Sequence, residues 1–119
     1  MKLAFVFKTA PQGVTYSREG LDALLAATAF CDETQIGVFF LDDGVFNLLH
    51  HQQPDLILQK NFIPAFKLLD LYDIENRFVC VQSLDRFGLL ETELNLNCEK
   101  IDRTLLIEKL RQAEKILTF

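Results

Sequence analysis

The chain is predicted to form one α/β domain over residues 1–119, a three-layer sandwich with a mostly parallel sheet of about five strands and helices on both faces. Three observations support this prediction. Short apolar, β-prone runs alternate with helical patterns, which is typical of parallel sheets. The first of these runs is apolar without interruption, as expected for a strand buried on both faces. The length of 119 residues suits one domain, and the sequence contains no linker or internal repeat.

The first half of the chain contains one clear amphipathic pattern between apolar runs. Apolar residues from Leu21 to Ala29 recur at the spacing of one helix face, and Ser17 before them is the predicted N-cap. In chain order, the predicted elements are a strand at 2–8, a helix at 18–31, a strand at 36–41 and a short helix at 44–50.

Two adjacent carboxylates, Asp42 and Asp43, end the second predicted strand. They are open to two interpretations, a metal or phosphoacceptor site or the cap of the short helix that follows. A receiver domain would need its acidic pair after the first strand, which ends instead in Lys8-Thr9. Capping of the short helix is therefore the favoured interpretation.

The second half of the chain adds two helices and three strands. Asn61 can cap a helix from Phe62 to about Leu71, with Pro64 in its first turn. This helix is apolar on most sides, so we expect it either to be sandwiched or to face a partner. Asp102 is the predicted cap of the last helix. Strands are predicted at 77–82, at 94–98 as an edge strand, and at 115–119.

Charge and hydropathy narrow the functional class. The formal net charge is −5 and the basic residues are scattered singly, which argues against direct binding to tRNA or DNA. Mean hydropathy is nevertheless positive, which suggests more apolar surface than one small domain can bury and predicts an oligomer interface. No apolar run approaches the roughly 20 residues that span a bilayer, and no leader is recognisable, so a cytosolic protein is expected.

The metal-ligating residue types show no convincing cluster. Cys31, Cys80 and Cys98 are widely spaced without a C-x-x-C pair, so neither a zinc site nor a thioredoxin-type dithiol is indicated. Free thiols suit a reducing cytosol. His50-His51 is a metal candidate, but adjacent side chains diverge and no third ligand is evident. A solvated loop is favoured there, and no metal or cofactor is expected.

Cys80 is the candidate catalytic residue. It precedes the point where the third apolar run breaks into polar residues, where open α/β sheets usually place their chemistry. If the strand ends near Gln82 and Ser83 caps a short helix, the positive end of that helix favours the thiolate. Arg77 and Arg86 are near in sequence and could add to this effect. The competing interpretation is that Cys80 is a small buried core residue.

Several blocks of the sequence resemble the TusC branch of the DsrE/DsrF family, namely residues 18–26, 38–46, 66–74 and 116–119. The likeness covers nearly the whole chain. It implies a subunit of a sulfur relay that serves 2-thiolation of the wobble uridine of certain tRNAs. It also implies assembly with TusB-like and TusD-like subunits into a heterohexamer, a dimer of trimers. Sulfur would pass as persulfide through a TusE-like carrier, and tRNA would be reached only indirectly.

The resemblance also bears on Cys80. The family's established sulfur carrier is a cysteine of TusD-type subunits, in the motif Cys-Val-x-x-x-Leu-x-x-x-Gly. Residues 80–88 follow this motif with one residue fewer, so Cys80 falls at or near the carrier position. Likeness to the TusC branch implies an accessory subunit that scaffolds its partners. The alternatives are that Cys80 itself carries persulfide, or that the chain is a flavodoxin-like binder with a deep pocket at the strand ends.

Overall fold

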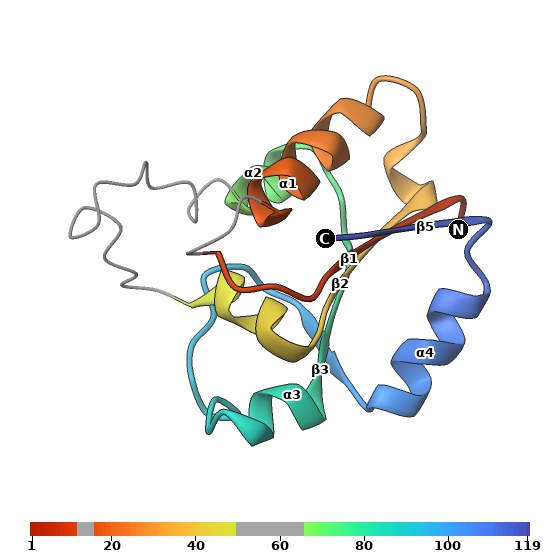
Figure 1. The fold of residues 1–119 in the computed structure, drawn as a ribbon. Coiled ribbons are helices and arrows are strands. Elements are labelled where there is room, and N and C mark those ends of the chain that lie inside the picture. The colour runs from red at the N-terminus through yellow and green to blue at the C-terminus, as the bar shows by residue number, and fades with distance from the viewer. Residues whose placement is uncertain (12–15, 50–65) are drawn as a thin grey trace.

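The computed structural model describes residues 1–11, 16–49 and 66–119. In these parts of the chain, five parallel strands form one sheet in the order β4-β3-β2-β1-β5 (Figure 1). The predicted α/β fold with a parallel sheet is confirmed. The strands are β1 Leu3–Phe7, β2 Ile36–Phe40, β3 Asn76–Cys80, β4 Glu99–Ile101 and β5 Lys115–Thr118.

Helices lie on both faces of this sheet (Figure 1). Side chains from α1, α2, α3 and the 3-10 helix η2 pack on one face, whereas α4 packs on the other. None of the helices in the described ranges has the length and apolarity needed to cross a bilayer. The helices are α1 Tyr16–Ala27, η1 Glu33–Gln35, η2 Asp42–Leu48, α2 Leu68–Leu71, α3 Val81–Arg86 and α4 Arg103–Arg111.

Phenylalanine rings fill the core on the face covered by α1, α2, α3 and η2, called the first face below. Successive strand side chains point to opposite faces, so Phe5 and Phe7 share this face with Phe40 of β2. The Phe7 ring centroid lies 5.4 Å from that of Phe40, 5.2 Å from Phe66 and 5.9 Å from Phe119. The residue at position 119 therefore packs into the core, which ties β5 to the centre of the sheet.

The second face depends on a single helix among the described residues. Phe39, Phe78 and Cys80 are buried there against Leu106 and Leu110 of α4. Asp102 caps this helix as predicted, because its carboxylate accepts a hydrogen bond from the Thr104 N–H at 2.8 Å. Cys80 thus lies on the face of the sheet that α4 covers.

Two predicted N-caps are wrong. Helix α1 begins at Tyr16, so Ser17 lies inside it, and its hydroxyl donates instead to the carbonyl oxygen of Thr9 at 3.0 Å. The third strand ends at Cys80 rather than at 82, and α3 follows at once. Cys80 therefore occupies the N-cap position of α3 that was predicted for Ser83, although its side chain makes no capping hydrogen bond.

The edge strand predicted at 94–98 is also wrong, since the edge strand is β4 at Glu99–Ile101. Residues before β4 form a loop that is fixed by polar contacts. The Asn95 side-chain amide donates to the Leu49 carbonyl at 3.2 Å, and Leu96 is buried in the core. The alternation of Leu94 and Leu96 that suggested a strand thus reflects the packing of a loop onto η2.

Other predictions fall partly outside the described residues. The short helix expected at 44–50 is the 3-10 helix η2, which starts two residues earlier at Asp42. The loop with His50-His51, Asn61 and most of the helix predicted from Phe62 lie outside the described ranges. Helix α2 is the described end of that predicted helix.

Candidate functional site

The Cys80 thiol lies at the carboxyl end of β3, which lies between β2 and the edge strand β4. Its side chain is fully buried, with 0% of its surface exposed, and it belongs to the core cluster under α4. The position at the carboxyl end of a strand matches the prediction from sequence. The full burial matches the competing interpretation of Cys80 as a core residue.

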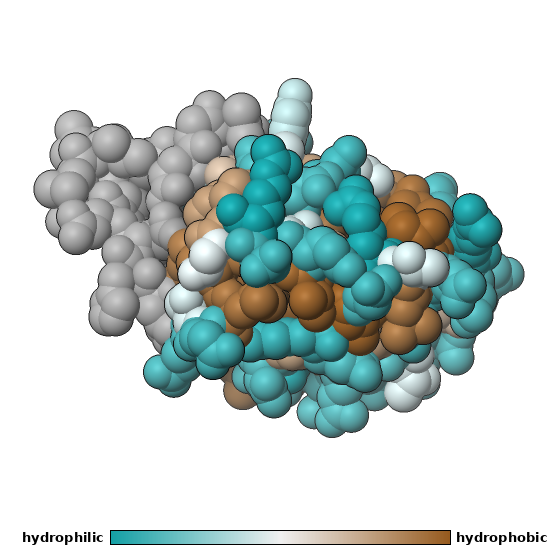
Figure 2. All heavy atoms as spheres, turned by 90° about the horizontal axis from the view of Figure 1, so that it is seen from below, coloured by the Kyte–Doolittle hydropathy of each residue, from teal (hydrophilic) through white to brown (hydrophobic). Residues whose placement is uncertain are grey.

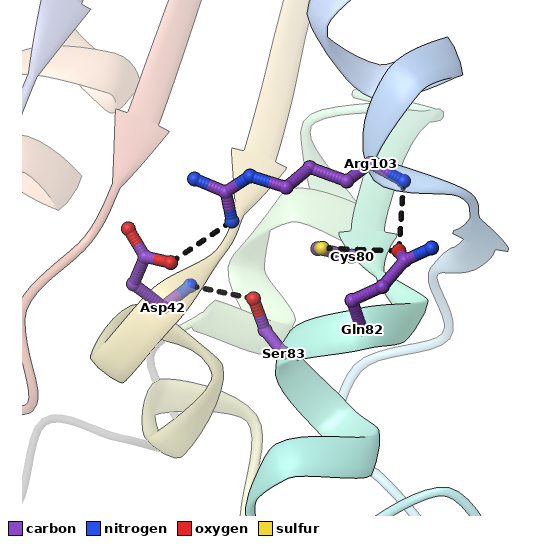
Figure 3. A network of polar contacts seen from close by, with 5 residues as sticks. All are labelled: Asp42, Cys80, Gln82, Ser83 and Arg103. Atoms are coloured by element: carbon purple, nitrogen blue, oxygen red, sulfur yellow. Dashed lines mark hydrogen bonds and ion pairs between the residues drawn. The ribbon is translucent and has the colours of Figure 1, made fainter.

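Gln82 connects Cys80 to the start of α4 (Figure 3). The oxygen Oε1 accepts a hydrogen bond from the backbone N–H of Arg103 at 2.8 Å and a weak one from the Cys80 thiol at 3.7 Å. The Gln82 amide in turn donates to the Asp102 carboxylate at 2.6 Å. This hydrogen bond, followed by the one from the Thr104 N–H, lowers the pKa of Asp102.

An ion pair lies on the other side of the thiol. The Arg103 guanidinium is 3.0 Å from the Asp42 carboxylate, and both side chains are partly exposed. This hydrogen bond is the main reason that the pKa of Arg103 is raised, and the nearby Cys80 adds to it while desolvation opposes it. Figure 3 shows the Arg103 side chain extending past Cys80 from α4 to Asp42.

The backbone at Asp42 is unusual. Its φ of 52° lies in the left-handed region, which residues other than glycine and asparagine or aspartate seldom adopt. Its N–H donates to the Ser83 hydroxyl of α3 at 2.8 Å. The cap of η2 is Leu41, without a side-chain hydrogen bond, so the prediction that Asp42 and Asp43 cap this helix is wrong. The Asp42 carboxylate faces Arg103 instead.

The arginines predicted beside Cys80 are engaged elsewhere. Arg77 forms an ion pair with Asp70, and the Arg86 guanidinium lies 5.2 Å from the Phe87 ring centroid. The guanidinium that reaches Cys80 belongs to Arg103, which sequence reasoning missed. The only available signal was its place directly after the predicted cap Asp102.

The other two cysteines lie on the opposite face of the sheet from Cys80. Cys31 and Cys98 pack against the first-face core, and all three thiols are free. Burial raises the pKa of Cys98 to about 12, against a smaller opposing effect of Arg77. The described residues therefore bring no second thiol to Cys80.

The described residues contain two surface hollows but no cluster suited to a metal. No cluster of three or more His, Cys, Asp or Glu side chains suitable for a metal exists among the described residues, while His50-His51 lies outside them. A surface hollow of about 320 Å³ runs along α4 from Arg103 to Arg111. A second, of about 350 Å³, is lined by residues of the 92–100 loop, including Cys98.

Similarity to known proteins extends over the full length of the chain. Residues 1–119 match the model of the DsrE/DsrF-like family. The chain belongs to the DsrE/DsrF-like family. It is 63% identical to a "Protein TusC homolog" of Haemophilus influenzae, with all of both chains covered. It is 46% identical to the "Protein TusC" of Escherichia coli O157:H7, covering 99% of this chain and 98% of that one. The resemblance to the TusC branch of the DsrE/DsrF-like family is thereby confirmed.

Solved structures agree on the fold. The ychN protein of E. coli superimposes with a TM-score of 0.81 at 21% identity, covering 100% of this chain and 99% of the other. A Bacteroides thetaiotaomicron protein, BT1422, gives a TM-score of 0.61 at 16% identity, covering 99% and 95%. At these identities the likeness shows a DsrE/DsrF-like fold and carries no information about the chemistry at Cys80.

Proposed function

We propose that the chain is an accessory subunit of a sulfur-relay complex that serves 2-thiolation of the wobble uridine of tRNA. Its role is to hold TusB-like and TusD-like subunits together in a cytosolic heterohexamer, a dimer of trimers. Sulfur passes as persulfide through a partner subunit and a TusE-like carrier, and this chain does not touch tRNA. Likeness to TusC proteins over the full length supports this assignment.

The full burial of Cys80 is the observation that carries the accessory role. A sulfur carrier must present a thiolate to its donor and its acceptor, because the thiolate is the attacking species. The Cys80 thiol has 0% exposure and donates to Gln82 at 3.7 Å. A thiol in this arrangement supports the core under α4 and cannot meet a partner's sulfur without a rearrangement.

Hydrophobic surface supports the scaffolding role. The end of the molecule that carries α3 shows a band of hydrophobic residues between hydrophilic ones (Figure 2). The rings of Phe46, in η2, and Phe87, after α3, contact each other in a tilted arrangement with centroids 4.7 Å apart, and both are partly exposed. In α2, Leu69 is fully buried whereas Leu71 is 77% exposed, so the exposed side of this helix offers apolar surface to a partner.

The test combines assembly with tRNA chemistry. The tagged chain is expressed with TusB-like and TusD-like partners, and we expect it to copurify with both as a complex larger than the free chain. In cells that lack the gene, Cys80→Ser should restore 2-thiouridine in tRNA as fully as the wild type does, with Cys31→Ser as the matched control. A monomer that ignores both partners would refute the proposal.

The alternative is that Cys80 carries the sulfur, and its place at the end of β3 beside Arg103 favours this. The Cys80 thiolate would attack the terminal sulfur of a donor persulfide. The donor's S–S bond breaks, a new S–S bond forms on Cys80, and the donor leaves as a thiolate, so no external oxidant is needed. Mass spectrometry after incubation with a persulfide donor would show one added sulfur on Cys80. Failure of Cys80→Ser to restore thiolation would favour this alternative.

A further inference from the structure

The Arg103 side chain runs past Cys80 at the carboxyl end of the sheet (Figure 3). It leaves the first turn of α4 and ends at Asp42, where its guanidinium is 3.0 Å from the carboxylate. In this view the Cys80 sulfur lies between Asp42 and Gln82, alongside the Arg103 stem. Cys80 is fully buried while the Arg103 and Asp42 side chains are 45% and 33% exposed.

We propose that Arg103 is a latch over Cys80, which the ion pair with Asp42 holds shut, and that the thiol becomes accessible only when this pair opens. The inference goes beyond the proposed function, because it concerns access to the thiol whether or not Cys80 ever carries sulfur. It defines a closed state, seen in this structure, and an open state in which the Arg103 side chain has left Asp42.

The backbone contacts allow the side chain to move without unwinding α4. The Arg103 N–H is held by Gln82 at 2.8 Å, and the Asp102 carboxylate caps the Thr104 N–H. Neither contact involves the guanidinium. Partly exposed ion pairs are weak and are screened by salt, so the pair opens at modest cost.

The other half of the latch is fixed in place. Asp42 adopts a left-handed conformation, with φ 52°, and its N–H is bound by the Ser83 hydroxyl at 2.8 Å. Ser83 belongs to α3, the helix that Cys80 precedes. Asp42, which holds the Arg103 side chain, is therefore bound to α3, the short helix that directly follows Cys80.

The test measures the alkylation rate of Cys80 by iodoacetamide in the full chain, peptide by peptide, with Cys31 as the internal reference. Asp42→Asn removes the ion pair and keeps a residue type that tolerates the left-handed backbone. We expect it to raise the Cys80 rate about two- to fivefold, as the weakness of exposed ion pairs implies. Arg103→Ala removes the stem as well and should give a larger increase. Asp43→Asn, with the same change of charge one residue away, should leave the rate unchanged.

The sign of the Arg103→Ala effect is diagnostic. Loss of a nearby positive charge disfavours the thiolate and by itself would slow alkylation, so a faster rate can come only from improved access. Salt should accelerate Cys80 in the wild type and not in Asp42→Asn. Should Arg103→Ala fail to fold, as judged by circular dichroism, Asp42→Asn and its salt dependence decide the question. Unchanged rates in Asp42→Asn, or a wild-type Cys80 as reactive as Cys31, would overturn the latch.

Discussion

Gln82 is the residue that joins the parts of the candidate site. Its oxygen accepts the Arg103 N–H, and its amide donates to the Asp102 carboxylate. One side chain of α3 therefore completes the N-terminus of α4, where backbone N–H groups lack partners inside the helix. The Cys80 thiol uses the same oxygen, so its surroundings are defined by the contact between two helices rather than by its own strand.

Gly44 allows the closest approach of two chain segments near this site. A Cβ atom at this position would overlap the carbonyl oxygen of Phe7 in β1. We expect Gly44→Ala to lower the free energy of unfolding by about 3 kcal/mol or more, because the backbone of β1 or η2 must move. Urea unfolding followed by circular dichroism measures this change.

Gly88→Ala is the matched control. Gly88 has a φ of 70°, but a Cβ there would meet no atom within 4 Å. The cost should then be the left-handed strain alone, about 1–2 kcal/mol. Equal losses for the two variants would mean that the contact between Gly44 and Phe7 is not what requires glycine.

The position of Cys80 could be predicted from the sequence, but its neighbours could not. The end of an apolar run marks the carboxyl end of a strand, and sequence distance suggested Arg77 and Arg86 as partners. Arg77 lies three positions before Cys80 in the same strand, so it points to the other face. The actual neighbour, Arg103, comes from a helix that reaches Cys80 only through the tertiary fold.

At the scale of elements, the cap of α4 depends on an ionised carboxylate. The pKa of Asp102 lies below its ordinary value of 3.8, mainly because of the hydrogen bond from Gln82. A lowered pKa in the folded state gives stability that is fully present above pH 3.8 and is lost as the pH falls through the lowered value. Acid should therefore weaken the start of α4.

Asp102→Asn tests this dependence. Asparagine keeps a good N-cap but cannot ionise. We expect the wild type to be more stable than the variant at neutral pH, and the difference to shrink on acidification to about pH 2. Chemical unfolding across this range measures both curves. A difference that stays constant with pH would show that the charge of Asp102 is irrelevant to stability.

Strands that are continuous apolar runs could be predicted from the sequence, whereas a strand that exists only through hydrogen bonding to its neighbour could not. Strands β1 and β2 are continuous apolar runs that are covered on both faces, so composition alone locates them. Strand β4 is a three-residue edge with exposed Glu99 and Lys100, and only its pairing with β3 makes it a strand. The Leu94–Leu96 alternation imitated a strand but serves a loop anchored by Asn95.

At the scale of the whole molecule, the sheet separates Cys80 from the other two cysteines. Cys80 lies under α4, whereas Cys31 and Cys98 pack on the opposite face. The sheet thus stands between Cys80 and the other two thiols, and an internal disulfide with Cys80 is geometrically excluded in this fold. Any sulfur exchange at Cys80 must therefore involve a thiol or persulfide from another molecule.

The path of α4 has a consequence for how the molecule opens. Strands β4 and β5 occupy opposite edges of the sheet, and α4 is the segment that connects them. In the part of the chain that the structure describes, each edge strand pairs with a single neighbour, so the connection through α4 helps to hold both in place. We expect residues 99–118 to behave as one cooperative unit, whose amide protons exchange with deuterium at a common opening free energy below that of β1 and β2.

Hydrogen exchange followed by mass spectrometry would resolve this unit. Amides of α4 that exchange well before those of β5 would show that the helix opens alone. Joint exchange would mean that a partner bound to either edge strand slows opening at the other edge and above Cys80. An assembly could then control the thiol from a distance, through the stability of one nine-residue helix.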